Sequence, residues 1–153
     1  MKHSHYQPLE SQPIISVKLA ITTPSRNYLL LTRAAKDKNR PGTIDLPGGG
    51  VDAGETPLQA CFREAKEELG IILPAERLEL RGYLERPSSY GHINQRHFWH
   101  VILTEENPNL VLNPQEHSAF QWLPLSEAYA SLSHPPLREG FALATGMIGF
   151  VPA

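Results

Sequence analysis

The sequence is poor in cysteine and has no long apolar run, and each shortage excludes a class of protein. Cys61 is the only cysteine among 153 residues, so no disulfide can form within the chain. A reducing compartment is the usual setting for such a chain, and we therefore expect it in the cytoplasm. No stretch approaches the roughly 20 apolar residues that a membrane-spanning helix needs, and the polar N-terminal residues lack the apolar core of a signal peptide.

An excess of charge of one sign is also missing. The formal net charge of -2 disfavours a long nucleic-acid surface, but it leaves room for a local basic pocket that binds a small phosphate ligand. A hydrophobic content of 41% with 20% charged residues is typical of a soluble globular protein. We expect a flexible tail over residues 1–12 and a single domain over 13–153, as a monomer or homodimer.

Apolar patterning predicts strands alternating with about three helices, which favours an α/β sandwich with a mixed sheet. The main helix should begin after Thr56, with Pro57 in its first turn, and end at Gly70. Its core-facing residues are predicted to be Leu58, Phe62, Ala65 and Leu69. The other predicted segments are strands over 14–22, 28–32, 44–46, 78–85, 97–104, 110–112 and 120–123, and helices over 126–132 and 137–144.

The helix after Thr56 carries an unusual group of acids. Glu64, Glu67 and Glu68 fall within an arc of about 100° on a helix of about 3.6 residues per turn. Carboxylates grouped in this way repel one another unless cations lie between them, and oxygen ligands suit Mg²⁺ or Mn²⁺ better than zinc. Taken alone, these three glutamates favour a solvated acidic helix face.

The residues before the helix change that balance. Three consecutive glycines begin at Gly48, more than a tight turn needs, and they let backbone groups approach a ligand closely. Glu55 is placed to pair with Arg63 and hold the helix edge. These features favour a ligand site over a solvated surface.

Residues 49–71 resemble the Nudix box, GX5EX7REUXEEXGU. Ala65 is smaller than the aliphatic residue that the pattern prefers, while Ile71 supplies the closing aliphatic position. The resemblance covers 23 residues and implies the Nudix fold, an α/β/α sandwich with a mixed β-sheet. The fixed positions of the pattern are occupied by Gly49, Glu55, Arg63, Glu64, Glu67, Glu68 and Gly70.

The resemblance implies a hydrolase that uses Mg²⁺, with Mn²⁺ as a possible substitute, to cleave the pyrophosphate linkage of a small nucleotide substrate. It implies that Glu64, Glu67 and Glu68 bind the metal together with the carbonyl of Gly48, and that Arg63 orients Glu64. Such an ion neutralises phosphate charge and activates water.

The resemblance also implies a general base, which is either a box glutamate or an acid on a downstream loop. Glu116 lies shortly before the predicted strand over 120–123, where relatives often carry such an acid. An exposed loop residue is an equally good interpretation of Glu116. His117 is a weaker candidate base and is expected at the surface.

Candidate substrate-binding residues lie outside the box. Arg33 follows a predicted strand in a context that resembles a phosphate-contacting arginine of relatives. Arg96 could meet a phosphate while a base stacks on Phe98 or Trp99, although an aromatic strand is more often part of the core.

Three functions remain open. Hydrolysis of a nucleoside triphosphate to the monophosphate and pyrophosphate is favoured, since we find none of the extra N-terminal domain that many ADP-sugar hydrolases use for dimerisation. An ADP-ribose or other nucleotide-sugar pyrophosphatase is the alternative. A non-catalytic Nudix-fold module that senses a nucleotide is disfavoured, because such modules typically lose box carboxylates and here none is lost.

Overall fold

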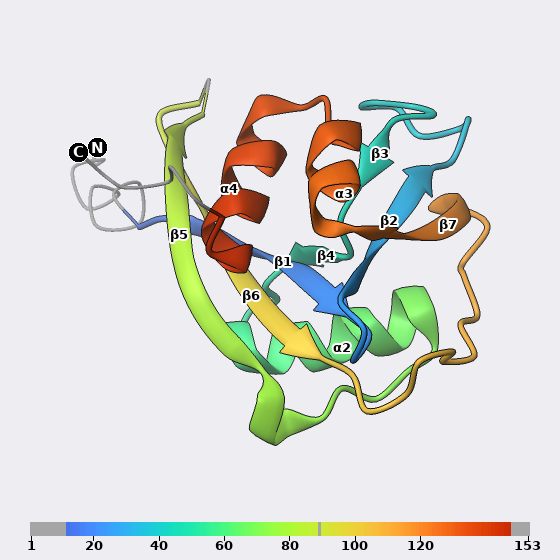
Figure 1. Cartoon of the computed structure of the whole chain (residues 1–153). Coiled ribbons are helices and arrows are strands. Elements are labelled where there is room, and N and C mark those ends of the chain that lie inside the picture. The colour runs from blue at the N-terminus through green and yellow to red at the C-terminus, as the bar shows by residue number, and fades with distance from the viewer. Residues whose placement is uncertain (1–11, 89, 148–153) are drawn as a thin grey trace, which may run out of the picture.

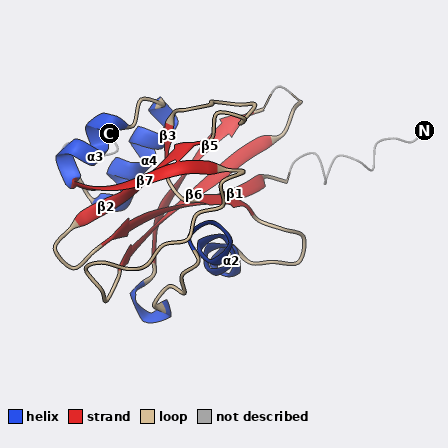
Figure 2. Ribbon diagram, turned by 90° about the vertical axis from the view of Figure 1, so that its right-hand side faces the viewer, coloured by secondary structure: helices blue, strands red, loops and turns tan. Residues whose placement is uncertain are grey.

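The computed structural model describes residues 12–88 and 90–147, which form three layers (Figure 1). A sheet lies in the middle, with α2 on one face and with α3 and α4 on the other (Figure 2). The elements are β1 (Ile14–Thr22), β2 (Asn27–Arg33), β3 (Ile44–Asp45), β4 (Gly48–Gly50), α2 (Pro57–Leu69), the 3-10 helix η2 (Ala75–Arg77), β5 (Glu79–Pro87), β6 (Ile93–Ile102), β7 (His117–Pro124), α3 (Leu125–Ser131) and α4 (Pro135–Thr145).

The sheet is mixed, as the sequence predicts. Its main path has the order β3-β2-β1-β6-β5, and β1 and β6 are parallel from the pair Ile14–Asn94 to the pair Thr22–Ile102. The other strand pairs are antiparallel. β1 and β2 share a single register pair at their hairpin, after which β1 pairs with β4 and β2 pairs with β7.

Alternation along the strands divides the core into two clusters. Trp99 of β6 packs with the α2 side of the sheet, while Phe98 packs with α3 and α4. In β1, Leu19 packs on the α2 side, and Ala20 packs on the side of α3 and α4. Burial of each large apolar side chain contributes about 1.5–3 kcal/mol, so both helical layers are held on the sheet mainly by these contacts.

Helix α2 has the predicted ends. Thr56 forms a capping box with Gln59, and Gly70 ends the helix in the left-handed conformation. The predicted core face is wrong at one position, because Leu58 is 42% exposed. Helix α2 instead buries a stripe that includes Glu64 and Glu68, since this face packs against the glycine strand β4 as well as the apolar sheet.

Other predictions differ locally. The glycines expected in a loop form strand β4, because their backbone pairs with β1. Residues 110–112 are not a strand, and β6 and β7 each begin earlier than predicted. The expected tail lies outside the described residues except for Gln12. No helix in the described part of the chain is long and apolar enough to cross a membrane.

Candidate active site

The glycine strand β4 lies directly against the acidic edge of α2. Gly48 has a φ of 144°, and a Cβ atom there would overlap the carbonyl oxygen of Val17. A Cβ atom on Gly49 would overlap the carboxylate of Glu64. The backbone N–H of Gly48 donates to Oε1 of Glu68 at 2.9 Å. Glycine is therefore required here so that backbone groups can reach two buried carboxylates.

Arg63 uses its whole guanidinium group for hydrogen bonds along this edge of α2. Its Nε and Nη2 donate to the two oxygens of Glu55 at 2.7 and 2.9 Å. Its Nη1 donates to Glu64 at 2.9 Å and to Glu67 at 3.2 Å, and Nη2 also donates to the carbonyl of Gly50 at 2.8 Å. All five N–H groups of the guanidinium are thus used, which leaves none for a substrate.

These contacts have electrostatic consequences. Hydrogen bonds from Arg63 lower the pKa of Glu55 to about 2. Hydrogen bonding to Glu55 in turn raises the pKa of Arg63, which keeps the guanidinium charged. The structure therefore brings Glu55 and Arg63 together as a rigid pair beside the buried acids.

Glu64 and Glu68 are carboxylates in an environment that opposes their charge. Burial raises the pKa of Glu68 to about 8, against the opposing effects of the Gly48 N–H and Lys18, and the nearby charge of Glu116 adds to the rise. Burial also raises the pKa of Glu64, while Arg63 opposes the rise. Grouped oxygen donors that lack enough positive charge are a donor set that fits a hard divalent cation.

Glu116 and His117 also lie close to Glu68. A bulge in the β2–β7 ladder between Thr32 and Arg33 brings His117 into register with Arg33. One ligand atom each from Glu68, Glu116 and His117 lie within 4.8 Å of one another. His117 is 5% exposed, so the expectation that it lies at the surface is wrong. Its burial, at the first position of β7, lowers its pKa.

Glu67 lies apart from this group. Its side chain is 57% exposed and contacts Arg63. The acids that lie beside the glycine strand are therefore Glu64, against Gly49, and Glu68, against Gly48, with Glu116 close to Glu68.

Positive side chains face the acids across a cavity of about 420 Å³. Its lining includes Glu68, Glu116, Lys18, Arg33 and Arg96. The cavity thus places acids and bases around one space, an arrangement suited to a metal ion and a polyanion together.

Asp45 organises two of these cations. It accepts from Lys18 Nζ at 3.1 Å and from Arg33 Nη1 at 2.6 Å. Burial alone would raise the pKa of Asp45, but Lys18, the Leu46 N–H and Arg33 bring it down to about 2. Lys18 and Asp45 were not predicted from the sequence. A lysine within the apolar strand IISVKLAIT was the available signal for the first.

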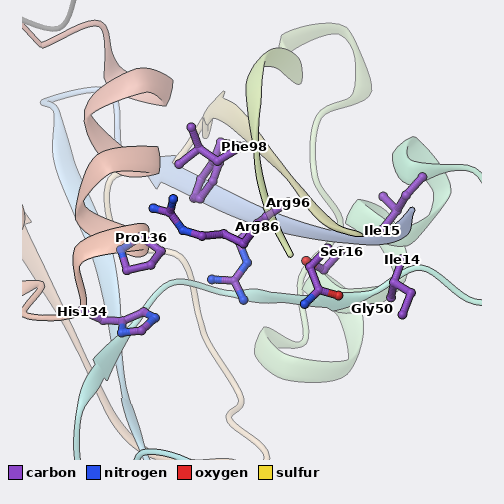
Figure 3. A pocket seen from close by; sticks show the side chains of 11 residues that line it. Ile14, Ile15, Ser16, Gly50, Arg86, Arg96, Phe98, His134 and Pro136 are labelled. Carbon is purple, nitrogen blue, oxygen red and sulfur yellow. The ribbon is translucent and has the colours of Figure 1, made fainter. Parts of the chain in front are cut away.

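A second cavity has a volume of about 380 Å³, and Figure 3 shows residues that line it. The two share Ser16, Gly50 and Arg96, so Arg96 stands between them. Phe98 and Pro136 give the second cavity an apolar wall. The structure thus brings Arg33 and Arg96 to the acidic pocket, and Phe98 to the adjoining one.

Trp99 lies elsewhere, in the core beneath α2, where its Nε1 has no hydrogen-bond partner in the described residues. Three polar residues of the second cavity were also not predicted from the sequence, because they come from separate segments without a shared motif. These residues are Arg86, Asn94 and His134.

Comparison with known proteins places this site in a family. The NUDIX domain model matches residues 13–143. The chain is 37% identical over 94 residues to the 8-oxo-dGTP diphosphatase of Escherichia coli, which covers 61% of this chain and 70% of the relative. It is 32% identical over 126 residues to the putative 8-oxo-dGTP diphosphatase 3 of Mycobacterium tuberculosis, which covers 82% of this chain but only 55% of that relative.

Solved structures agree on the fold. The MutT protein of Methanosarcina mazei Go1 superposes with a TM-score of 0.73 at 24% identity, covering 90% of this chain and 96% of that one. The MutT NUDIX hydrolase of Burkholderia pseudomallei gives 0.69 at 27% identity, covering 87% and 98%. The predicted α/β/α Nudix fold is confirmed, and the chain belongs to the NUDIX family.

Proposed function

We propose that the protein is a Mg²⁺-dependent pyrophosphohydrolase that cleaves a nucleoside triphosphate to a nucleoside monophosphate and pyrophosphate. The observation that carries the proposal is the cavity in which Glu68 and Glu116 face Lys18, Arg33 and Arg96. A metal ion would neutralise the carboxylates on the acidic side, and a pyrophosphate would neutralise the cations on the basic side. Mn²⁺ is expected to substitute for Mg²⁺.

The protein's own residues have distinct tasks in this proposal. Glu64 and Glu68 hold the ion with the Gly48 carbonyl, and Arg63 fixes the orientation of Glu64 through its 2.9 Å contact. Bound Mg²⁺ supplies charge neutralisation and a water of lowered pKa. Glu116 lies at the exposed end of a turn, restrained through a 3.3 Å contact from Asn113, and accepts the proton of the attacking water.

Glu67 stays a predicted metal ligand. To reach an ion beside Glu68 it would have to exchange its contact with Arg63 for the metal. Its exposed side chain leaves space for that rotation.

The second cavity supports a nucleoside as the remaining part of the substrate. Arg96, at the junction, is placed for a phosphate, and Phe98 forms part of the wall of the space beyond it. The names of the two relatives, both 8-oxo-dGTP diphosphatases, favour a triphosphate over ADP-ribose. We also propose a cytoplasmic setting, which a single buried cysteine supports.

The test is a substrate panel with product identification by mass. The panel contains 8-oxo-dGTP, the ordinary nucleoside triphosphates and ADP-ribose, each with Mg²⁺ and with a chelator. Monophosphate plus pyrophosphate supports the proposal, whereas AMP plus ribose 5-phosphate supports the nucleotide-sugar alternative. Glu68→Gln should lower kcat by orders of magnitude in a folded protein. Tight nucleotide binding without turnover of any member would refute catalysis and favour a sensing module.

A further inference from the structure

We infer that His117 is a nitrogen ligand of the metal site, which strengthens the binding of divalent first-row transition ions there and does little for Mg²⁺. The inference rests on the proposed function, because the ion in question is the one that the carboxylates would hold. It concerns a residue outside the box that the sequence analysis considered only as a weak candidate base.

The first observation is the state of the imidazole. His117 is 95% buried, and its Nδ1 is buried without a hydrogen-bond partner in the described residues. A buried polar group without a partner is unfavourable, so such groups in native proteins need an explanation. His117 lines the acidic cavity, and an ion bound there would give the imidazole a partner beyond the described residues.

The second observation is the geometry around the ring. A ring nitrogen of His117 and one oxygen each from Glu68 and Glu116 lie within 4.8 Å of one another. Metal bonds to nitrogen and oxygen are about 2.0–2.2 Å long, so two ligands on opposite sides of one ion lie about 4.0–4.4 Å apart. Small side-chain adjustments therefore suffice for His117 and Glu68 to bind a single ion, with Glu116 close enough to accept a proton from a water beside it.

The third observation is that hydrogen bonds with the backbone hold both His117 and Glu68 in place. The N–H of His117 donates to the carbonyl of Asn113 at 3.0 Å, while Glu68 accepts from the Gly48 N–H at 2.9 Å. Bulges of the kind beside Arg33 are common next to active sites, where they re-aim a side chain. The ring is thus held at the cavity by the sheet.

A mixed donor set has a different metal preference from an all-oxygen one. Mg²⁺ takes oxygen ligands and keeps several waters, whereas imidazole suits transition ions whose affinity rises along the first row. His117 should therefore strengthen binding of Mn²⁺, Fe²⁺ or Co²⁺ and do little for Mg²⁺.

Pulsed electron paramagnetic resonance of one equivalent of Mn²⁺ on the full chain tests this directly. A coordinated imidazole gives a ¹⁴N modulation, which should appear in the wild type and change to the ¹⁵N pattern when the protein contains ¹⁵N-histidine. The modulation should disappear in His117→Gln. It should persist in His134→Gln, the matched control, because His134 lines the adjoining cavity and not the acidic one.

Metal titration gives the second readout. His117→Gln should weaken Mn²⁺ binding roughly tenfold or more and change Mg²⁺ binding much less. If the variant does not fold, absence of histidine coupling in the labelled wild type still overturns the inference. Absence of Mn²⁺ binding, or bound Mn²⁺ without histidine coupling, would overturn the inference, as would coupling that survives in His117→Gln. Mg²⁺-dependent turnover without histidine coupling would leave the proposed function intact, whereas histidine coupling without turnover would refute that function alone.

Discussion

Glu68 should make the metal-free protein less stable as the pH rises. Burial raises the pKa of Glu68 from its ordinary 4.5 to about 8, so the folded state holds this proton more tightly than the unfolded state does. Its contribution to stability is therefore fully present below pH 4.5 and is lost as the pH rises through about 8. At about 1.36 kcal/mol per pKa unit, the whole change corresponds to at most about 5 kcal/mol.

Buried histidines act in the opposite direction in part of that window. Burial lowers the pKa of His100 to about 4, and unfolded histidines are still half protonated at pH 6.5. Between pH 6.5 and 8.5 Glu68 should remove about 2 kcal/mol relative to a variant that cannot ionise at this position but keeps the same histidines. With a urea m-value of about 2 kcal/mol/M, the unfolding midpoint of the wild type should fall by about 1 M relative to that variant.

The assay is urea unfolding with a chelator at both pH values for three proteins. Glu68→Gln can still accept the Gly48 N–H and cannot ionise, so its midpoint should change only through the histidines. Glu67→Gln removes a neighbouring but exposed carboxylate and should retain the wild-type pH dependence. Adding Mg²⁺ or Mn²⁺ at pH 8.5 should restore the wild type and not Glu68→Gln. An equal fall in all three proteins would show that Glu68 is not the group responsible.

Three further predictions concern stability and turnover. Asp45→Leu should cost about 3–5 kcal/mol in chemical unfolding because it leaves buried Lys18 without a carboxylate and Arg33 with Asp37 alone, whereas Lys18→Met should cost less because Asp45 keeps its arginine partner. Gly140→Ala should cost about 1–3 kcal/mol, read as a lower Tm, because the new Cβ would overlap the ring of Phe98. Arg63→Lys should keep the fold but lower kcat more than it changes KM, since a lysine cannot make five hydrogen bonds; an unchanged kcat would remove Arg63 from the positioning of the acids.

Local patterns were sufficient for most of the fold. The ends of α2 could be predicted from Thr56 and Gly70 because capping depends on residues adjacent in sequence. The extent of β4 could not, since glycines have no side chains to alternate and the strand exists only through its pairing with β1. Partner strands far away in sequence determine such an element.

The site divides in the same way. The spacing within α2 indicates which acids share an edge with Arg63, so that part needed no tertiary information. Lys18 and His117 come from strands on either side of the box, and their approach to Glu68 depends on strand pairing and on the bulge beside Arg33. No local pattern of charge could have predicted that His117 would be buried beside two acids.

The error at Leu58 connects the fold to the function. Amphipathic periodicity assumes that a helix buries its apolar residues and exposes its charged ones. Helix α2 instead leaves Leu58 partly exposed and buries Glu64 and Glu68 against glycines that have no side chains to oppose them. That orientation lowers the stability of the metal-free protein at neutral pH. It also leaves the two carboxylates with too little positive charge nearby, which a divalent cation would supply, so the packing that destabilises the metal-free site strengthens metal binding.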